Sequence, residues 1–174
     1  MNATLQCLAN IKPITEYLLN QNNYNFLYKN NDLCKLTLEY IQVLIGLFLS
    51  ETIIGSYCPE NFKKTISELN PLFQGVQAND SKDLIIFILE IMNNELVNIH
   101  NKKHNISNNE VEVYQEINIS DENMVLIRFL KDYRKKYCTV IGNNLIGFNK
   151  SVFTCYYCNG KTINFNIVKF TLVW

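Results

Sequence analysis

The sequence has no excess of either charge and no long apolar run. Its 174 residues carry 16 basic and 16 acidic side chains, so the formal net charge is zero. Without a field of one sign we expect no attraction to nucleic acid or to an anionic membrane, which leaves a protein as the expected partner. The longest apolar run, residues 43–49, is bracketed by polar side chains. It is far shorter than the roughly 20 residues that cross a bilayer, and it predicts a buried helix.

The start of the chain also lacks the pattern of a secretory signal. No positively charged segment there precedes an apolar run and a small-residue cleavage site. We therefore expect an intracellular protein, located in the cytoplasm, the nucleus or both. In that setting most cysteines are expected to be reduced thiols that act as small apolar side chains. The chain has six, at positions 7, 34, 58, 138, 155 and 158.

Apolar periodicity predicts helices first and strands afterwards. Helical spacing covers residues 1–10, 14–19, 32–49, 60–69, 79–99 and 121–137, and Asp32 is the expected N-cap of the third of these helices. Residues 20–31 and 100–119 are polar and are predicted to be loops. From Ser151 onward apolar and polar residues alternate, which predicts two strands around a turn at residues 155–160. With 48% hydrophobic residues the chain is long enough for one domain or for part of a larger one, and it contains no internal repeat.

Two aspartates mark the start of the longest predicted helix. Asp80 and Asp83 are three positions apart and would share one face of its first turn. Carboxylates in this position can accept charge-assisted hydrogen bonds. Aspartates at helix starts also act as caps and complement the helix dipole. The two roles are compatible, and both stay open at this point.

Cys155 and Cys158 have the spacing of half a zinc site. A structural zinc needs four ligands, so three interpretations compete: half of a shared zinc site, a redox pair, or plain thiols near a hairpin turn. The redox pair is disfavoured because the strand-helix pattern of a thioredoxin-like motif is missing. His100 and His104 are four apart, but their polar neighbours predict a frayed, solvated helix end, and no third ligand is close in sequence. A metal role for the two histidines is therefore disfavoured.

Three blocks of the sequence, in order, resemble the ubiquitin-specific proteases, a family of cysteine deubiquitinases also called ubiquitin carboxyl-terminal hydrolases. Residues 1–10 (Met-Asn-Ala-Thr-Leu-Gln-Cys-Leu-Ala-Asn) resemble the stretch that directly follows the nucleophilic cysteine. Residues 73–84 resemble the family's Gln-Gln-Asp box, with Asp80 and Asp83 at its acidic positions. Residues 153–158, followed by a strand ending at 170–172, look like the first zinc-knuckle half of the fingers subdomain. These blocks are spread over most of the length of the chain, from its first residue to residue 172, and they favour the zinc half-site.

The resemblance implies an α+β, papain-like fold, of which this chain would form the N-terminal half. A mainly helical thumb would occupy about residues 1–138, and the first β-strands of the fingers about residues 150–174. Within this partial catalytic domain, 1–99 would be thumb-like helices, 100–119 a polar loop or insertion, and 120–174 a helix and the start of the fingers. Thumb helices separated from the rest of such a domain would expose apolar patches, so we expect poor solubility for the chain alone.

The resemblance also implies a chemistry, thiol attack on the carbonyl after the last glycine of ubiquitin. The nucleophilic cysteine is expected two positions before Met1, and neither histidine lies in anything like the family's histidine box. No catalytic residue is therefore assigned within the chain, and we expect it to be inactive alone. Asp80 and Asp83 would hold the basic Arg-Leu-Arg-Gly-Gly tail of ubiquitin, although Ala78 departs from the family's glutamine and puts one polar contact in doubt.

No cofactor would be required for catalysis, and a structural zinc would bind if the chain continues beyond Trp174. The expected partners are ubiquitin or ubiquitinated proteins. Three alternatives stay open: a truncated piece of an active deubiquitinase whose missing motif lies just upstream, a non-catalytic ubiquitin-binding or adaptor protein, and a helical interaction protein unrelated to ubiquitin.

Overall fold

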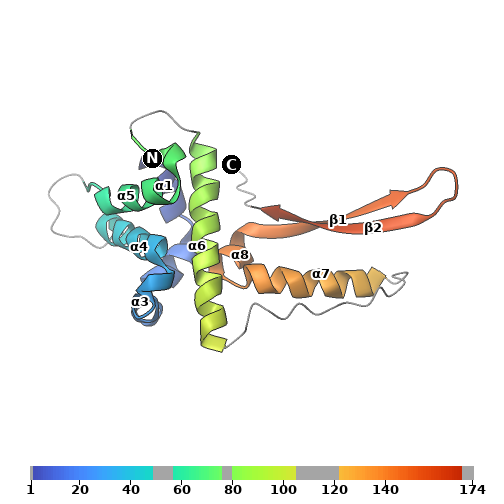
Figure 1. Cartoon of the computed structure of the whole chain (residues 1–174), viewed down its shortest axis with the longest axis horizontal. Helices are drawn as coiled ribbons and strands as arrows, with labels where there is room; N and C mark the ends of the chain where they lie inside the picture. The colour runs from blue at the N-terminus through green and yellow to red at the C-terminus, as the bar shows by residue number, and fades with distance from the viewer. Residues whose placement is uncertain (1, 49–56, 76–79, 105–121, 170–174) are drawn as a thin grey trace.

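The computed structural model describes residues 2–48, 57–75, 80–104 and 122–169. Helices come first along the chain and an antiparallel pair of strands follows (Figure 1). This order confirms the predicted α+β class, with a helical region followed by the first strands. The elements are α1 (Asn2–Ala9), α2 (Lys12–Leu19), α3 (Gln21–Tyr28), η1 (Asn31–Leu33), α4 (Lys35–Phe48), α5 (Glu60–Leu69), η2 (Pro71–Phe73), α6 (Ser81–His104), α7 (Glu122–Tyr137), α8 (Val140–Leu145), β1 (Ile146–Thr154) and β2 (Lys161–Lys169).

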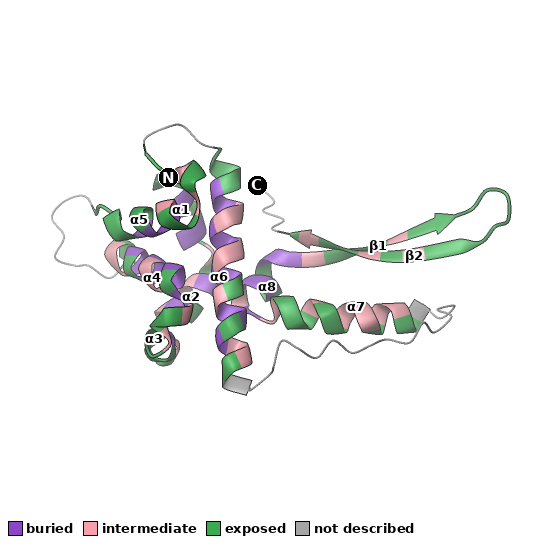
Figure 2. Ribbon diagram, in the orientation of Figure 1, coloured by how far each residue is buried: buried purple, intermediate pink, exposed green. Residues whose placement is uncertain are grey.

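Helix α6 is the central element of the fold. It has α1 and α4 against it on one side and α7 and α8 on the other (Figure 1). Its apolar residues cover most of its circumference, and Figure 2 shows buried positions along most of its length. A helix that is apolar nearly all round must be covered from several directions, which is the arrangement observed. Its fully buried members include Ile88, Leu89 and Met92, which join the core formed by the N-terminal helices.

Helix α4 is capped by a residue far away in the sequence. The carboxylate of Glu95 on α6 accepts hydrogen bonds from the main-chain nitrogens of Leu36 (2.9 Å) and Thr37 (2.8 Å), and from the Thr37 hydroxyl (2.6 Å). These nitrogens belong to the first turn of α4, where no intrahelical acceptor exists. The predicted cap, Asp32, lies instead in the short helix η1, so that prediction is wrong. Glu95 can cap α4 because α6, on which it lies, packs against α4.

The apolar run at the end of α4 is only partly buried. Val43 and Leu44 are in the core, whereas Leu47 and Phe48 are 40% and 52% exposed. The run was predicted to be a buried helix, and this holds for its first turn but not for its end. Leu47 lines a pocket instead of packing fully against neighbouring side chains, and Leu49 lies outside the described residues.

Three helical segments differ from the sequence-based expectation. Residues 20–31 are not a loop, because Asn20 caps α3 by accepting hydrogen bonds from the nitrogens of Asn22 (3.0 Å) and Asn23 (3.4 Å). Helix α6 continues past Ile99 to His104, so its predicted end is five residues short. Helix α8 was not predicted, and it is capped by the Thr139 hydroxyl, 2.9 Å from the nitrogen of Gly142. Residues 105–119 of the other predicted loop lie outside the described residues.

The two strands form a long hairpin that projects away from the helices, with α7 alongside it (Figure 1). They pair antiparallel from Ile146 opposite Lys169 to Thr154 opposite Lys161. Strand β1 starts five residues before the predicted alternation begins at Ser151, and the predicted turn at residues 155–160 is confirmed. Phe129 of α7 packs on Phe148 and Phe165, with ring centroids 5.2 and 5.5 Å apart. This aromatic contact holds the base of the hairpin against α7.

Candidate functional site

The two predicted aspartates lie at the beginning of α6. Asp80 is the N-cap residue: its Oδ1 accepts a hydrogen bond from the nitrogen of Lys82 (2.8 Å), and its carbonyl accepts from Leu84 (3.1 Å). Asp83 lies in the first turn, and both aspartates are exposed. Within the described residues the other carboxylate oxygen of Asp80 has no hydrogen-bond donor. The cap interpretation therefore applies to Asp80, and both carboxylates remain accessible from solvent.

The segment before α6 brings the chain to this position through a turn. Phe73, at the end of η2, packs on Phe87 of α6 with ring centroids 5.2 Å apart. Gly75 then adopts a φ of +81°, a left-handed conformation that favours glycine. Ala78, the position that departs from the Gln-Gln-Asp pattern, lies outside the described residues. The aromatic anchor and the glycine turn fix where the chain approaches the first turn of α6.

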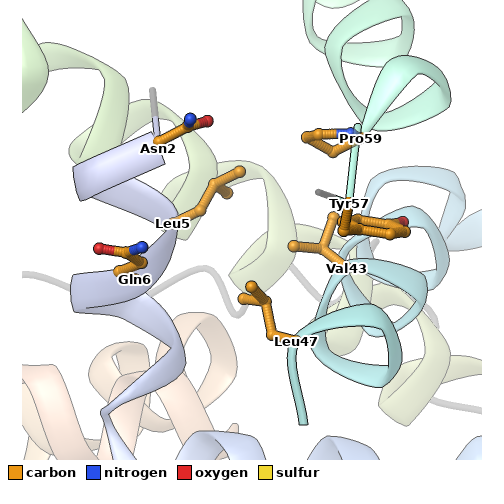
Figure 3. A pocket seen from close by; sticks show the side chains of 7 residues that line it. All are labelled: Asn2, Leu5, Gln6, Val43, Leu47, Tyr57 and Pro59. Atoms are coloured by element: carbon orange, nitrogen blue, oxygen red, sulfur yellow. The ribbon is translucent and has the colours of Figure 1, made fainter. Parts of the chain in front are cut away.

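Helix α1 packs on α6 and borders an apolar pocket. Leu5 and Leu8 are buried, in agreement with the helical periodicity of residues 1–10, whereas Cys7 is exposed and does not act as a small apolar side chain of the core. The pocket has a volume of about 200 Å³, and Figure 3 shows side chains from α1 and α4 projecting into the space between these helices. Asn2 and Gln6 form its polar edge. The full lining is Asn2, Leu5, Gln6, Val43, Leu47, Tyr57 and Pro59.

Tyr57 closes one side of this pocket by packing on a glycine. A Cβ atom added to Gly46 would lie 2.6 Å from the Tyr57 ring, far inside contact distance. The ring can therefore lie directly against the backbone of α4 only because residue 46 has no side chain. Burial raises the pKa of the Tyr57 phenol, with smaller contributions from Glu39 and Cys58.

The cysteine pair lies at the tip of the hairpin. Within the turn, Asn159 N donates to Cys155 O (2.9 Å) and Cys155 N donates to Gly160 O (2.8 Å). Both thiols are exposed. Hydrogen bonds from the Cys158 main chain, the Cys158 thiol and the Tyr157 main chain lower the pKa of Cys155. The turn therefore favours the thiolate, which is the form of cysteine that binds metals.

The turn thus supplies two convergent thiols but no complete metal site. Across the described ranges, no group of three or more His, Cys, Asp or Glu residues is placed to hold a metal ion. Helix α6 runs through both His100 and His104, so the predicted frayed end is wrong for the backbone. His100 is half-buried.

Sequence reasoning missed a buried polar cluster that positions the hairpin. Asn93 is 2% exposed; its Nδ2 donates to the carbonyl of Lys136 (3.0 Å), and its Oδ1 accepts from the Thr139 hydroxyl (2.6 Å). The end of α7 and the start of α8 are thereby fixed to α6. A second link is the ion pair between Lys169 and Glu90 at 2.8 Å. The sequence signal that could have revealed this cluster was Asn93, a single asparagine on the apolar side of a long helix.

Membrane insertion by a helix is not indicated by the described part of the chain. No helix there has both the length and the apolar character needed to cross a bilayer.

Comparison with known proteins indicates the family to which the chain is similar. The family model described as ubiquitin carboxyl-terminal hydrolase matches residues 1–168. Ubiquitin carboxyl-terminal hydrolase 12 of Saccharomyces cerevisiae is 25% identical over 178 residues, covering 95% of this chain and 14% of the relative. Ubiquitin carboxyl-terminal hydrolase 15 of Homo sapiens is 27% identical over 176 residues, covering 95% and 16%. Ubiquitin carboxyl-terminal hydrolase 4 of Mus musculus is 25% identical over 169 residues, covering 95% and 17%.

The chain thus spans about one sixth of the length of these relatives. The match to the family model nevertheless runs through all three blocks that carry the resemblance, from α1 through the start of α6 to the hairpin. The chain belongs to the ubiquitin carboxyl-terminal hydrolase family, as its three sequence blocks predicted.

Proposed function

We propose that this chain is part of a thiol-dependent deubiquitinase, which hydrolyses the bond after the C-terminal glycine of ubiquitin through an acyl-enzyme. The observation that carries the proposal is the family match over residues 1–168. Ubiquitin and ubiquitinated proteins are the proposed partners, and the cytoplasm or nucleus is the proposed location.

Asp80 and Asp83 are the proposed contact for the basic tail of ubiquitin. Their exposure supports this role, as does the Asp80 carboxylate oxygen that accepts no hydrogen bond from a described residue. Arginine side chains bind carboxylates through charge-assisted hydrogen bonds that are stronger than neutral ones. Capping and tail binding are compatible, because capping uses only one of the two Asp80 oxygens.

The proposed nucleophile is a cysteine two positions before Met1, at the N-terminal end of α1. This helix has no acidic residue in its first turn, so nothing on that turn offsets its positive end. A positive helix end lowers the pKa of a nearby thiol and favours the reactive thiolate.

The 174-residue polypeptide by itself is proposed not to hydrolyse ubiquitin bonds. Cys7 is exposed but lies in the sixth position of α1, beyond the first turn. The two histidines of the chain lie in the last five residues of α6. At 1.5 Å per helical residue, His100 is about 30 Å along the helix from Asp80, too far to act as a general base beside the proposed tail site.

The test is a charge reversal of the proposed tail site. Asp80→Lys with Asp83→Lys in the 174-residue protein should weaken ubiquitin binding by roughly tenfold or more, which corresponds to about 1.4 kcal/mol. The readout is isothermal titration with ubiquitin. Glu60→Lys is the matched control, because Glu60 is an exposed acidic residue in the first turn of a different helix, α5. Equal affinity of the double variant and the control would contradict the tail site.

Catalysis is tested separately on the natural full-length protein. A ubiquitin vinyl sulfone probe should form a covalent adduct with it, and peptide mapping should place the adduct on a cysteine before Met1. The same probe should leave the 174-residue chain unlabelled. Labelling at Cys7 would overturn this assignment.

Cys155 and Cys158 are the proposed half of a structural zinc site, with the other two ligands supplied from outside the described residues. Support comes from their exposed, convergent thiols and the lowered pKa of Cys155. Catalysis would not require this metal. Metal analysis of the full-length protein should show zinc that is lost in Cys158→Ser and retained in Cys58→Ser, a variant at another exposed cysteine.

A further inference from the structure

The hairpin turn contains the only Asn-Gly dipeptide of the chain, Asn159–Gly160. Among the described residues, Asn159 is the only non-glycine residue with a positive φ, at 53°. This left-handed conformation is accessible to asparagine but costly for most other side chains. The turn therefore has a structural reason to carry asparagine at position 159.

Position 160 has a separate reason to be glycine. A Cβ atom there would lie 3.2 Å from the sulfur of Cys158, closer than an ordinary contact. Glycine leaves this space to the thiol. The two requirements act on neighbouring positions, so the geometry of the cysteine turn itself places asparagine directly before glycine.

Both residues are open to attack by the main chain and by water. Asn159 and Gly160 are exposed. In the part of the chain that the structure describes, neither the Asn159 side-chain amide nor the Gly160 N–H makes a hydrogen bond. The hydrogen bonds that form the turn use the Asn159 N–H and the Gly160 carbonyl instead, at 2.9 and 2.8 Å. The atoms needed for a cyclisation are thus not held by other partners.

We propose that Asn159 is a site of spontaneous deamidation. The Gly160 nitrogen, after losing its proton to a base in solution, attacks Cγ of Asn159. A carbon–nitrogen bond forms, the Cγ–Nδ2 bond breaks, and ammonia leaves with a proton taken from water. The product is a five-membered succinimide. Addition of water to one of its two carbonyl carbons then breaks a carbon–nitrogen bond and gives aspartate or isoaspartate, with no change of oxidation state.

Glycine at position 160 favours this cyclisation. It has no Cβ to obstruct the approach of its nitrogen, and its backbone can adopt the necessary conformations. Two other exposed asparagines of the hairpin, Asn149 and Asn166, are followed by lysine and isoleucine and are fixed in paired strands. These two residues are therefore expected to react more slowly and serve as internal controls.

The modification changes the turn that carries the two cysteines. Isoaspartate routes the main chain through the former side chain and lengthens it by one carbon between Cys158 and Gly160. The hydrogen bond from Cys155 N to the Gly160 carbonyl (2.8 Å) spans this lengthened link, so we expect its geometry to change. Either product also places a negative charge directly beside Cys158.

The experiment is peptide mapping of the folded 174-residue protein after incubation at neutral and at mildly alkaline pH. Mass spectrometry separates asparagine from its products, and isoaspartyl methyltransferase labelling identifies isoaspartate. We expect conversion at Asn159 to be roughly tenfold faster, or more, than at Asn149 or Asn166 in the same digest, because only Asn159 precedes a glycine. The rate should rise with pH, since the attacking nitrogen must be deprotonated.

Two variants complete the test. Asn159→Gly can adopt a positive φ but has no amide to lose, so the turn should persist without conversion. Asn159→Asp reproduces one product and should retain normal main-chain length. Equal conversion at Asn159, Asn149 and Asn166, or conversion at Asn159 only after denaturation, would overturn the proposal.

Discussion

Glu95 illustrates how one residue can support the fold through groups distant in sequence. It lies on α6 and accepts three hydrogen bonds from Leu36 and Thr37 at the start of α4. Burial raises the pKa of its carboxyl group, and the hydrogen bonds only partly offset this. The three donors thus hold the Glu95 carboxyl group in place, while its burial disfavours the charged form.

The first prediction concerns the pH dependence of stability. Because the pKa of Glu95 is higher in the folded than in the unfolded state, its contribution to stability is largest below the ordinary glutamate pKa. That contribution decreases as pH rises through the folded-state pKa. The free energy of unfolding of the wild type, minus that of Glu95→Gln, should therefore fall as pH rises from acid to neutral. Urea denaturation at a series of pH values measures this difference.

Removal of the side chain has a separate effect. Glu95→Ala should destabilise the protein by about 1–3 kcal/mol at neutral pH, because it leaves donors at the start of α4 without their acceptor. Glu90→Ala is the control, since Glu90 lies on the same helix in an exposed ion pair worth about 0–1 kcal/mol. Two results would contradict this account of Glu95. One is a free-energy difference between the wild type and Glu95→Gln that grows with pH, and the other is an equal loss of stability in Glu95→Ala and Glu90→Ala.

At the scale of elements, the short connection between α7 and β1 sets the direction of the hairpin. Helix α8 lies in this connection, and Thr139 and Asn93 tie it to α6. Gly142 is buried at the point where α8 approaches the end of α7. Its lack of a side chain allows the two helices to come this close.

The second prediction tests that close approach. Gly142→Ala would place a Cβ atom 2.1 Å from the main-chain oxygen of Tyr137, which cannot move aside as a side chain could. We expect a loss of about 1–3 kcal/mol, typical of overpacking a well-packed site. The measurement is the urea midpoint and slope of the variant. Gly147→Ala is the matched control, because a Cβ there meets no atom within 4 Å; similar stabilities of the two variants would contradict the steric argument.

For the molecule as a whole, apolar side chains remain at the surface of the helical part. Phe48 is 52% exposed and Leu72 is 76% exposed, and Met124 and Ile127 on α7 are each 50% exposed. Exposed apolar surface of this kind promotes association when it forms contiguous patches. The chain also spans only about one sixth of its relatives.

The third prediction follows from this surface. The 174-residue chain alone should self-associate at high concentration, as its sequence led us to expect. Phe48→Ser with Leu72→Ser should reduce the association without lowering the melting temperature, because both side chains are largely exposed. Size-exclusion chromatography with light scattering over a concentration series measures it. A monodisperse monomer at every concentration would show the prediction to be wrong.

Local signals account for what the sequence determined by itself. Helical periodicity placed α4, α5 and α7 within a few residues, and Pro59 and Pro71 bounded α5 because proline limits helices from both sides. Alternation and the Cys155–Gly160 turn predicted the hairpin. The three motif blocks pointed to the family for the same reason, since each is a short continuous stretch. One local signal was misjudged, because the asparagine-rich composition of residues 20–31 concealed Asn20 as a helix cap.

The tertiary structure decided the features that depend on partners far away in the chain. Glu95 could not be identified as the cap of α4, because its acceptor groups lie 58 and 59 residues from their donors. The role of Asn93 likewise depends on Lys136 at the end of α7 and on Thr139, which lie 43 and 46 residues away in sequence. The exposure of Cys7 and the pocket between α1 and α4 likewise depend on which helices pack together. The periodicity of apolar residues reflects interactions between residues close in sequence. The burial of a side chain and the hydrogen bonding of a buried polar group are decided only when distant segments pack together.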